Sequence, residues 1–316
     1  MQRIKINAFT LIELLIVIAI IGILSALIVV GMSSTTQKAT IAKAQVFSNS
    51  LRNSLMGNLV SEWKFDGSGL NDGDSATTAY TQDTWSGGNN CSINGSPKVK
   101  TGSNCVNSSC LQFNGSSDYL SCGTGVLIGS NSFTFSFWGK TSINNAMQSV
   151  IRRTASVTGW SGYFKVPAGE SLNGLFEITS GTYSAGSIYR YISPTNSNLN
   201  TVDGKWHFLV GTCDRSQHRA PDVYLDGVLV NGISNGTCDL LTDDIPAGTL
   251  YIGSGSTFYY FNGSIDDVRI FNIAITIVQI QQDYFAGINK LLANNQINDQ
   301  EYSERVVELT KTYAKN

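Results

Sequence analysis

Glu13 is the residue whose type and position point most directly to chemistry, because it is a lone carboxylate near the start of an apolar run that reaches Met32. An ionisable group at membrane depth costs about 2.5–3.5 kcal/mol on insertion scales, so one that is kept there indicates a functional role. The alternative is that Glu13 reaches the headgroups, since it lies near one end of the run.

The apolar run is long enough to cross a bilayer as a helix, which takes about 20 residues. Ser25 is the only polar side chain between residues 14 and 32. A secretory signal peptide has an apolar core of only about 7–15 residues and a small-residue cleavage site, which this run lacks. Arg3 and Lys5 precede the run and favour a cytoplasmic N-terminus. We expect a single membrane span over 9–32 and a helix over 9–57, with the rest of the chain outside.

The segment Asn7-Ala8-Phe9-Thr10-Leu11-Ile12-Glu13-Leu14 resembles the start of type IV pilins and pseudopilins. The resemblance implies that residues 1–8 are a leader, which a prepilin peptidase removes between Ala8 and Phe9. Phe9 would then be N-methylated, and Glu13 would be the fifth mature residue. The family usually has Gly before the cut, so Ala8 predicts slower processing at worst.

This resemblance also gives Glu13 a partner. Cleavage creates an ammonium group at Phe9, and in staggered helices Glu13 of one subunit faces Phe9 of its neighbour. Opposite charges about 4 Å apart gain on the order of 4 kcal/mol at an effective dielectric of 20. We expect this pair to fix the register of a helical homopolymer, assembled with other pilins by machinery in the inner membrane.

The composition of the chain limits the kinds of partner that it can bind. The chain has 21 basic and 23 acidic residues, so no basic footprint for nucleic acid is present. Downstream of Leu59 the composition is rich in Gly, Ser, Asn, Thr and aromatic residues, which is typical of extracellular β-structure.

Six cysteines lie in the part predicted to be outside the membrane, and an even count there predicts disulfides. The segment between Cys110 and Cys122 has the pattern of a hairpin centred near Ser116, which would place these two cysteines opposite each other. The remaining expected pairs are Cys213 with Cys238 and Cys91 with Cys105. The chain has no C-x-x-C pair, which argues against zinc.

Short alternating runs separated by Asn-Gly and Asp-Gly dipeptides predict antiparallel strands joined by hairpins. These runs occupy 132–138, 162–166, 174–178, 206–210, 223–225 and 265–271. We therefore expect an α+β chain overall, in which the long N-terminal helix is followed by an all-β antiparallel sandwich over 58–287.

The strands resemble, in order, those of LamG-like jelly rolls in the concanavalin A-like lectin and glucanase group. The matching pieces are Trp63-Lys-Phe-Asp-Gly-Ser-Gly69, Leu111-Gln-Phe-Asn-Gly115, Phe133-Thr-Phe-Ser-Phe-Trp138, Asp203-Gly-Lys-Trp-His-Phe208, Val223-Tyr-Leu-Asp-Gly227 and Phe261-Asn-Gly-Ser-Ile-Asp-Asp-Val-Arg-Ile-Phe271. Some members bind Ca²⁺, and the resemblance offers Asp66, Asp72 and Asp266 as ligands, with Asp74 or Asp267 in support. Carboxylates suit Ca²⁺, but Asp66 and Asp72 also suit Asp-Gly turns.

No catalytic constellation accompanies this fold. His207 has no nucleophile assigned to it and is interpreted as structural. Glu177 stands alone between two apolar residues, without the paired carboxylates of an E-x-D-x-x-E array. We expect no enzyme activity.

Phe258, Tyr259 and Tyr260 form an unusual aromatic cluster before Phe261. Alternation sends Phe261 to the core and leaves some of its neighbours exposed. Exposed rings suit stacking on sugars or peptides, whereas rings that merely cap the sandwich have no ligand. The cluster is the predicted contact for a glycan or protein ligand.

The C-terminal residues 288–316 predict a short helical hairpin, with helical patterns at 288–293 and 299–313 and a closing helical turn before them over 273–287. The sequence leaves open whether this hairpin packs on the sandwich or on a neighbouring subunit.

Together these features predict a structural subunit of a type IV pilus-like filament whose LamG-like head serves adhesion or ligand binding. The chain would reside in the inner membrane before assembly and on the cell surface afterwards. The alternatives are a minor pilin or pseudopilin of a type II secretion or DNA-uptake machine, and a membrane-anchored lectin that never polymerises.

Overall fold

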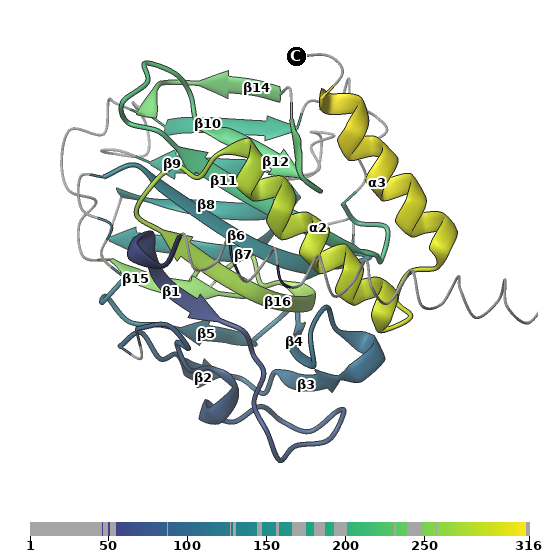
Figure 1. Ribbon diagram of the computed structural model, residues 1–316. Coiled ribbons are helices and arrows are strands. Elements are labelled where there is room, and N and C mark those ends of the chain that lie inside the picture. The colour runs from purple at the N-terminus through teal and green to yellow at the C-terminus, as the bar shows by residue number, and fades with distance from the viewer. Residues whose placement is uncertain are drawn as a thin grey trace, which may run out of the picture. The chain divides into compact units, whose positions relative to one another are not determined.

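Two antiparallel sheets packed face to face form the described part of the chain, and two helices follow them (Figure 1). The computed structural model describes Val46, Ser50 and residues 55–313, apart from 87, 127, 129–130, 144–146, 156–157, 166–174, 180–186, 193–200, 231, 239–247 and 257. The predicted sandwich and the two C-terminal helices are confirmed. The predicted helix over 9–57 lies almost entirely outside the described residues.

Sheet A has the strand order β13-β12-β11-β6-β16-β4-β3, and β1 pairs with the second half of β16. Its strands are β1 (Leu59–Trp63), β3 (Lys98–Thr101), β4 (Ser109–Asn114), β6 (Phe133–Lys140), β11 (Trp206–Cys213), β12 (Asp222–Leu225), β13 (Val228–Leu229) and β16 (Asn262–Phe271).

Sheet B has the order β14-β10-β9-β8-β7-β15-β5-β2. Its strands are β2 (Ser92–Asn94), β5 (Tyr119–Ser121), β7 (Gln148–Ala155), β8 (Thr158–Lys165), β9 (Leu175–Thr179), β10 (Ser187–Ile192), β14 (Gly232–Asn235) and β15 (Thr249–Ile252). Short 3-10 turns precede or join them: η1 (Met56–Asn58), η2 (Thr78–Tyr80) and η3 (Gly102–Asn104).

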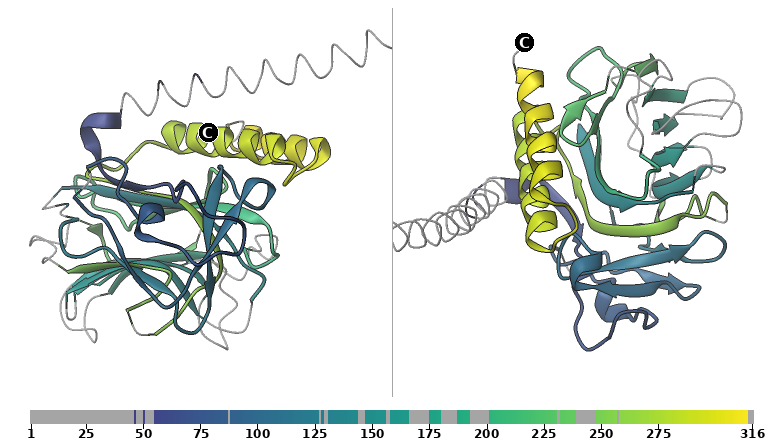
Figure 2. Two further views of the ribbon diagram at one scale, coloured as in Figure 1. Left: turned by 90° about the horizontal axis from the view of Figure 1, so that it is seen from below. Right: turned by 90° about the vertical axis from the view of Figure 1, so that its right-hand side faces the viewer.

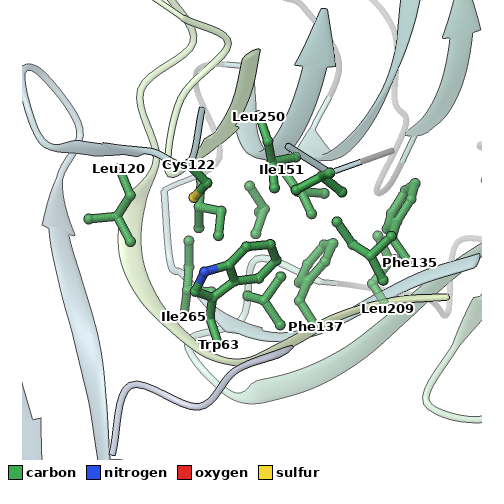
Figure 3. Packing of buried hydrophobic residues seen from close by; sticks show 14 of the residues in the cluster. Trp63, Leu120, Cys122, Phe135, Phe137, Ile151, Leu209, Leu250 and Ile265 are labelled. Carbon is green, nitrogen blue, oxygen red and sulfur yellow. The ribbon is translucent and has the colours of Figure 1, made fainter. Parts of the chain in front are cut away.

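The main core lies between the two sheets and follows from the alternation of each strand. On β6, Phe135 and Phe137 point into it, and Leu209 of β11 joins them from the same sheet. Ile151 and Leu250 come from sheet B (Figure 3). The expectation that Phe261 belongs to the core is confirmed, since this side chain is fully buried.

Sheet A is buried on its other face as well, because helices α2 (Ile277–Ala293) and α3 (Asp299–Tyr313) cover it (Figure 2). Trp138 of β6 stacks on Tyr284 of α2 at 5.7 Å between ring centroids, and Phe208 of β11 packs beside it. Burial on both faces explains why every residue of β11 is buried and why its sequence is almost continuously apolar. The C-terminal hairpin therefore packs on its own sandwich.

The boundary predicted at residue 287 lies inside α2, which is one helix from Ile277 to Ala293. A capping box at Thr276 and Gln279 starts this helix. Gly287 lies in the interior of this helix, at the point where the helix backbone packs directly against the Trp138 ring. Any residue with a Cβ would clash with that ring. The glycine is thus a point of close approach and does not end the helix. The second predicted helix, over 299–313, is confirmed.

Two of the three expected disulfides are wrong. The structure links Cys91 with Cys122 and Cys105 with Cys110, while Cys213 pairs with Cys238 as expected. The physical reason is that residues 115–118 do not join the two strands of a hairpin, because β4 belongs to sheet A and β5 to sheet B. The chain turns a corner between the sheets there, and Cys122 meets Cys91 where β5 and β2 pair.

Candidate functional site

The residues predicted for processing and assembly, Ala8, Phe9 and Glu13, lie outside the described part of the chain. Among the described residues, no helix combines the length and the apolar character needed to cross a bilayer.

A bulge in β16 brings predicted acidic residues together. The register between β16 and β6 shifts after Asp266, and Asp267 has a positive φ of 46°. A bulge of this kind adds one residue to a strand and redirects the side chains on either side of it. Asp266 and Asp267 are both buried as a result. They lie close enough to Asp66 that their charges act on one another.

Backbone amides and two cations hold these three carboxylates. Oδ2 of Asp266 accepts from the amides of Val106 and Asn107, each at 3.0 Å. Asp267 has Lys290 Nζ at 3.6 Å and Arg269 Nη2 at 3.7 Å. Burial, and then the charge of Asp267, raise the pKa of Asp266 well above its ordinary value. Burial also raises the pKa of Asp66.

The predicted calcium ligands are therefore only partly brought together. Asp72 is engaged elsewhere, since it accepts from Thr101 and pairs with Lys100 at 3.2 Å. Asp74 accepts from the amide of Asn71. In the part of the chain that the structure describes, no group of three or more His, Cys, Asp or Glu side chains is arranged to hold a metal ion.

His207 lies on β11 between two carboxylates. Its Nδ1 is 2.7 Å from Oδ2 of Asp226, and its Nε2 is 3.1 Å from Oδ1 of Asp203. Burial disfavours the charged imidazole, but the charges of Asp226 and Asp203 outweigh it and raise the pKa of His207 to about 9. At neutral pH both ring nitrogens are therefore donors. In this state the imidazolium donates to the carboxylates of both Asp226 and Asp203.

The aromatic cluster lies in the loop between β15 and β16. Phe258 and Tyr259 are 41% and 39% exposed, Tyr260 is half-buried, and the rings of Phe258 and Tyr259 meet edge to face at 4.8 Å. The amide of Gly255 donates to the carbonyl of Phe258, which closes the loop into a tight turn. Of the predicted ligand-contact residues, Phe258 and Tyr259 are thus exposed, whereas Tyr260 is partly covered.

Sheet B adds aromatic and basic side chains that the sequence reasoning did not single out. Tyr119 of β5 lies 6.0 Å from Tyr251 of β15 and 6.2 Å from Tyr260, measured between ring centroids. Arg152 of β7 stands opposite Tyr251 in the register and lies 4.9 Å from the centre of the Phe258 ring. We call Tyr119, Arg152, Tyr251, Phe258, Tyr259 and Tyr260 the aromatic platform.

The alternation of β5 and β15 could have located the two tyrosines. Leu120 points into the core and so do Leu250 and Ile252, which places Tyr119 and Tyr251 on the outer face of sheet B. Their meeting with the loop could not be read from alternation, because it depends on which strands are neighbours.

Two antiparallel sheets packed face to face are the architecture of a lectin-like β-sandwich domain. The model of the concanavalin A-like lectin/glucanases superfamily matches residues 114–281, which is more than half of the chain. The chain belongs to this superfamily. A second model, the prokaryotic N-terminal methylation motif, matches residues 3–29.

Solved structures show the same fold at low sequence identity. The binding domain of Paraclostridial Mosquitocidal Protein 1 has 12% identity and a TM-score of 0.54, and the match covers 73% of this chain and 53% of that one. The receptor binding domain of the botulinum neurotoxin C/D mosaic serotype has 16% identity and a TM-score of 0.53, with 72% and 51% covered. This chain thus spans about half the length of these toxin domains.

Domain 4 of AbnA, an extracellular arabinanase of Geobacillus stearothermophilus, was solved in complex with arabinotriose. It has 17% identity and a TM-score of 0.52, and the match covers 72% of this chain and 98% of that one. A comparison with curated protein sequences gives no match.

Proposed function

We propose that the protein is a structural subunit of a type IV pilus-like surface filament whose head binds a surface ligand. The observation that carries this proposal is the presence, on one chain, of the methylation motif over residues 3–29 and a concanavalin A-like domain. The motif supplies the segment that pilins use for processing and assembly. The domain supplies a stable head that a filament would display many times.

Assembly would rest on Phe9 and Glu13. Removal of residues 1–8 by a prepilin peptidase frees the amino group of Phe9, and in a staggered bundle Glu13 of the adjacent subunit neutralises it. A head-to-tail contact of this kind does not close on itself, so it produces a filament. The chain would wait in the inner membrane and move to the cell surface as the filament grows.

The head is suited to an exposed position. Three disulfides link the described domain, which fits an oxidising compartment. Helices α2 and α3 cover the outer face of sheet A, whereas sheet B carries the aromatic platform. The arabinotriose bound to domain 4 of AbnA and the receptor-binding role printed for the toxin domain support a recognition role for this fold. We infer that the head serves adhesion.

Mass spectrometry of filaments sheared from the cell surface tests the proposal. We expect an abundant chain whose N-terminal peptide begins at methylated Phe9. A trace amount in filaments built from another subunit would instead show a minor pilin or a pseudopilin. An unprocessed chain that stays in the membrane would show an anchored lectin and refute assembly.

The variant Glu13→Ala sharpens this test. Its matched control is Ser25→Ala, because Ser25 is the one polar side chain that follows Glu13 in the apolar run up to Met32. We expect Glu13→Ala to remain in the membrane fraction and to give no filaments, and Ser25→Ala to assemble normally. Normal filaments from Glu13→Ala would show that the charge pair is not required.

A further inference from the structure

We propose that the ammonium group of Lys290 is the permanent cation of the acidic cluster at the β16 bulge, in place of the calcium ion that the resemblance to LamG-like domains predicts there. The acidic cluster consists of Asp66, Asp266 and Asp267. The head would then fold without a divalent cation, because its own C-terminal helix supplies the positive charge. This role of Lys290 goes beyond the proposed function, since it depends neither on assembly nor on adhesion.

Lys290 lies in the last turn of α2 and reaches the acidic cluster from there. Its Nζ is 3.6 Å from Oδ2 of Asp267, whose side chain is only 3% exposed. Burial raises the pKa of Asp66 and of Asp266, and the charge of Lys290 opposes that rise in both groups. One ammonium group therefore acts on all three carboxylates. The Lys290 side chain is itself 30% exposed, so the lysine keeps part of its hydration while it neutralises buried charge.

Arg269 is the other cation near Asp267, but its charge is engaged elsewhere. Its Nη2 is 3.7 Å from Oδ2 of Asp267, whereas its Nε is 2.9 Å from Glu62. Its Nη1 is 3.0 Å from Asp283. Two carboxylates outside the acidic cluster therefore hold this guanidinium at shorter distances, and the ammonium of Lys290 is the cation that belongs to the cluster.

A second side chain at the end of α2, that of Asn294, holds the loop that faces the acidic cluster. Its Nδ2 donates to the three successive carbonyls of residues 105–107, at 3.4, 3.1 and 3.2 Å. Two amides of the same loop donate in turn to Oδ2 of Asp266, and a short disulfide closes the loop. Asn294 follows Lys290 by four residues, so the two side chains leave the same face of the helix. The end of α2 therefore contacts the cluster and its loop together.

Protein donors occupy the oxygens that a calcium ion would need. Calcium takes about 6–8 oxygen ligands from carboxylates, backbone carbonyls and water. Both carboxylate oxygens of Asp266 accept from backbone amides, and Oδ2 of Asp267 accepts from Nδ2 of Asn107 at 2.7 Å. Among the described residues, Oδ1 of Asp267 has no donor, and the carbonyls of residues 105–107 are engaged by Asn294. One buried oxygen without a donor is too few for calcium, whereas buried carboxylates do require a fixed cation.

An internal cation changes how the stability of the head depends on its surroundings. The stabilisation that a bound ion gives falls with the free concentration of that ion. A lysine is part of every copy of the chain, so its contribution does not fall when calcium is scarce. We therefore expect the head to tolerate a chelator, and we expect loss of the Lys290 charge to act as loss of an ion would.

Thermal unfolding of the full-length chain in detergent tests the independence from metal. Near-ultraviolet circular dichroism follows the head, because all 5 tryptophans lie downstream of Leu59. The melting temperature Tm is compared in EDTA and in about 10 mM CaCl2, which exceeds the Kd of about 10⁻⁴–10⁻³ M of weak extracellular calcium sites. We expect the same Tm within about 1 °C. A Tm that is higher by about 3 °C or more in CaCl2, but not in MgCl2, would overturn the proposal.

The variant Lys290→Met, measured in EDTA, tests the role of the ammonium group, because methionine keeps an apolar stem and removes the charge. Lys100→Met is the matched control. The Lys100 side chain is 26% exposed and also pairs with an aspartate, but that aspartate, Asp72, is 43% exposed. We expect Lys290→Met to lower the Tm by about 5 °C or more, and Lys100→Met by about 2 °C or less. Equally small losses in the two variants would refute the role of Lys290.

A double variant shows whether the ammonium acts through the acidic cluster. Asp267→Asn removes the carboxylate that Lys290 approaches most closely, so the Tm losses of Lys290→Met and Asp267→Asn should not add when the two are combined. Fully additive losses would mean that Lys290 stabilises the head through other contacts. None of these results depends on whether the chain forms filaments, so this test and the filament test fail independently.

Discussion

Nη1 of Arg269 lies 3.0 Å from Oδ2 of Asp283, and Nε of the same side chain lies 2.9 Å from Oε1 of Glu62. One guanidinium therefore joins the last strand of sheet A to α2 on one side and to β1 on the other. Burial disfavours its charge, but Asp283, Asp267 and Glu62 outweigh that effect and raise the pKa of Arg269 above its ordinary value. Glu62 is fully buried, so water cannot readily take the place of the Arg269 guanidinium as the partner of its carboxylate.

Arg269→Met should strongly destabilise the domain, because it removes the closest cation from the buried carboxylate of Glu62 and from Asp283. Breaking a buried ion pair in this way costs about 3–5 kcal/mol. The matched control is Lys100→Met, which removes the half-exposed pair with Asp72 and should cost about 1 kcal/mol or less. Urea unfolding of both variants measures the difference. Similar losses would show that the Arg269 network contributes no more than a surface pair.

His207 should make stability depend on pH. Its pKa is about 9 in the folded chain and about 6.5 when unfolded. The folded state therefore binds more protons, and the contribution is complete below about pH 6.5 and is lost as the pH rises through about 9. This difference between the folded and unfolded pKa values corresponds to about 3 kcal/mol of unfolding free energy. Urea unfolding measured from about pH 6 to pH 10 should show this decline.

His207→Gln keeps a polar side chain but removes the titrating group. At neutral pH this variant should be less stable than the wild type, and its unfolding free energy should show little of the decline toward alkaline pH. His218→Gln removes the chain's other imidazole, which is exposed, and should behave like the wild type. A decline of equal size in His207→Gln would assign the pH dependence to other groups.

Gly287→Ala should destabilise the chain even though alanine favours helices. The helix gain is about 1 kcal/mol, whereas a methyl group forced against the Trp138 ring costs about 1–3 kcal/mol or more. Gly57→Ala is the control, since a Cβ there meets nothing within 4 Å. The two melting temperatures compare the sites. A stabilised Gly287→Ala variant would mean that α2 does not approach Trp138 closely.

The disulfide pairing predicts unequal effects of removing each bond. The Cys91–Cys122 bond closes a loop with a separation of 31 residues, and Cys105–Cys110 closes one of 5. Loop entropy then gives about 3–4 kcal/mol for the first and about 2 kcal/mol for the second. Double serine variants measure these losses. Peptide mapping without reduction checks the pairing itself, and a fragment that links Cys110 to Cys122 would contradict the structure.

Much of the fold was accessible from local patterns. The strand at 265–271 and the one at 206–210 were predicted because a period of two and flanking turn residues are local properties of the chain. The Asp226-Gly227 dipeptide forms the turn between β12 and β13 with positive φ at both residues, as such dipeptides favour. The helix over 299–313 has acidic residues in its first turn, which suits the helix dipole.

The errors came where distant segments decide the outcome. Residues 110–122 have the local pattern of a hairpin, and only the partition of β4 and β5 between two sheets separates Cys110 from Cys122. The segment predicted to close at Gly287 continues as α2 to Ala293, and Gly287 packs there against Trp138.

The sequence by itself determined the methylation segment around Phe9 and Glu13, the class of the head and the aromatic loop at 258–260. Each of these depends on residues that are neighbours in the chain. The tertiary structure decided the disulfide pairs, the packing of α2 and α3 on sheet A, and the placement of Tyr119 and Arg152 beside that loop. Those depend on strand order and register, which are fixed by the burial of two sheets against each other and leave no local trace in the chain.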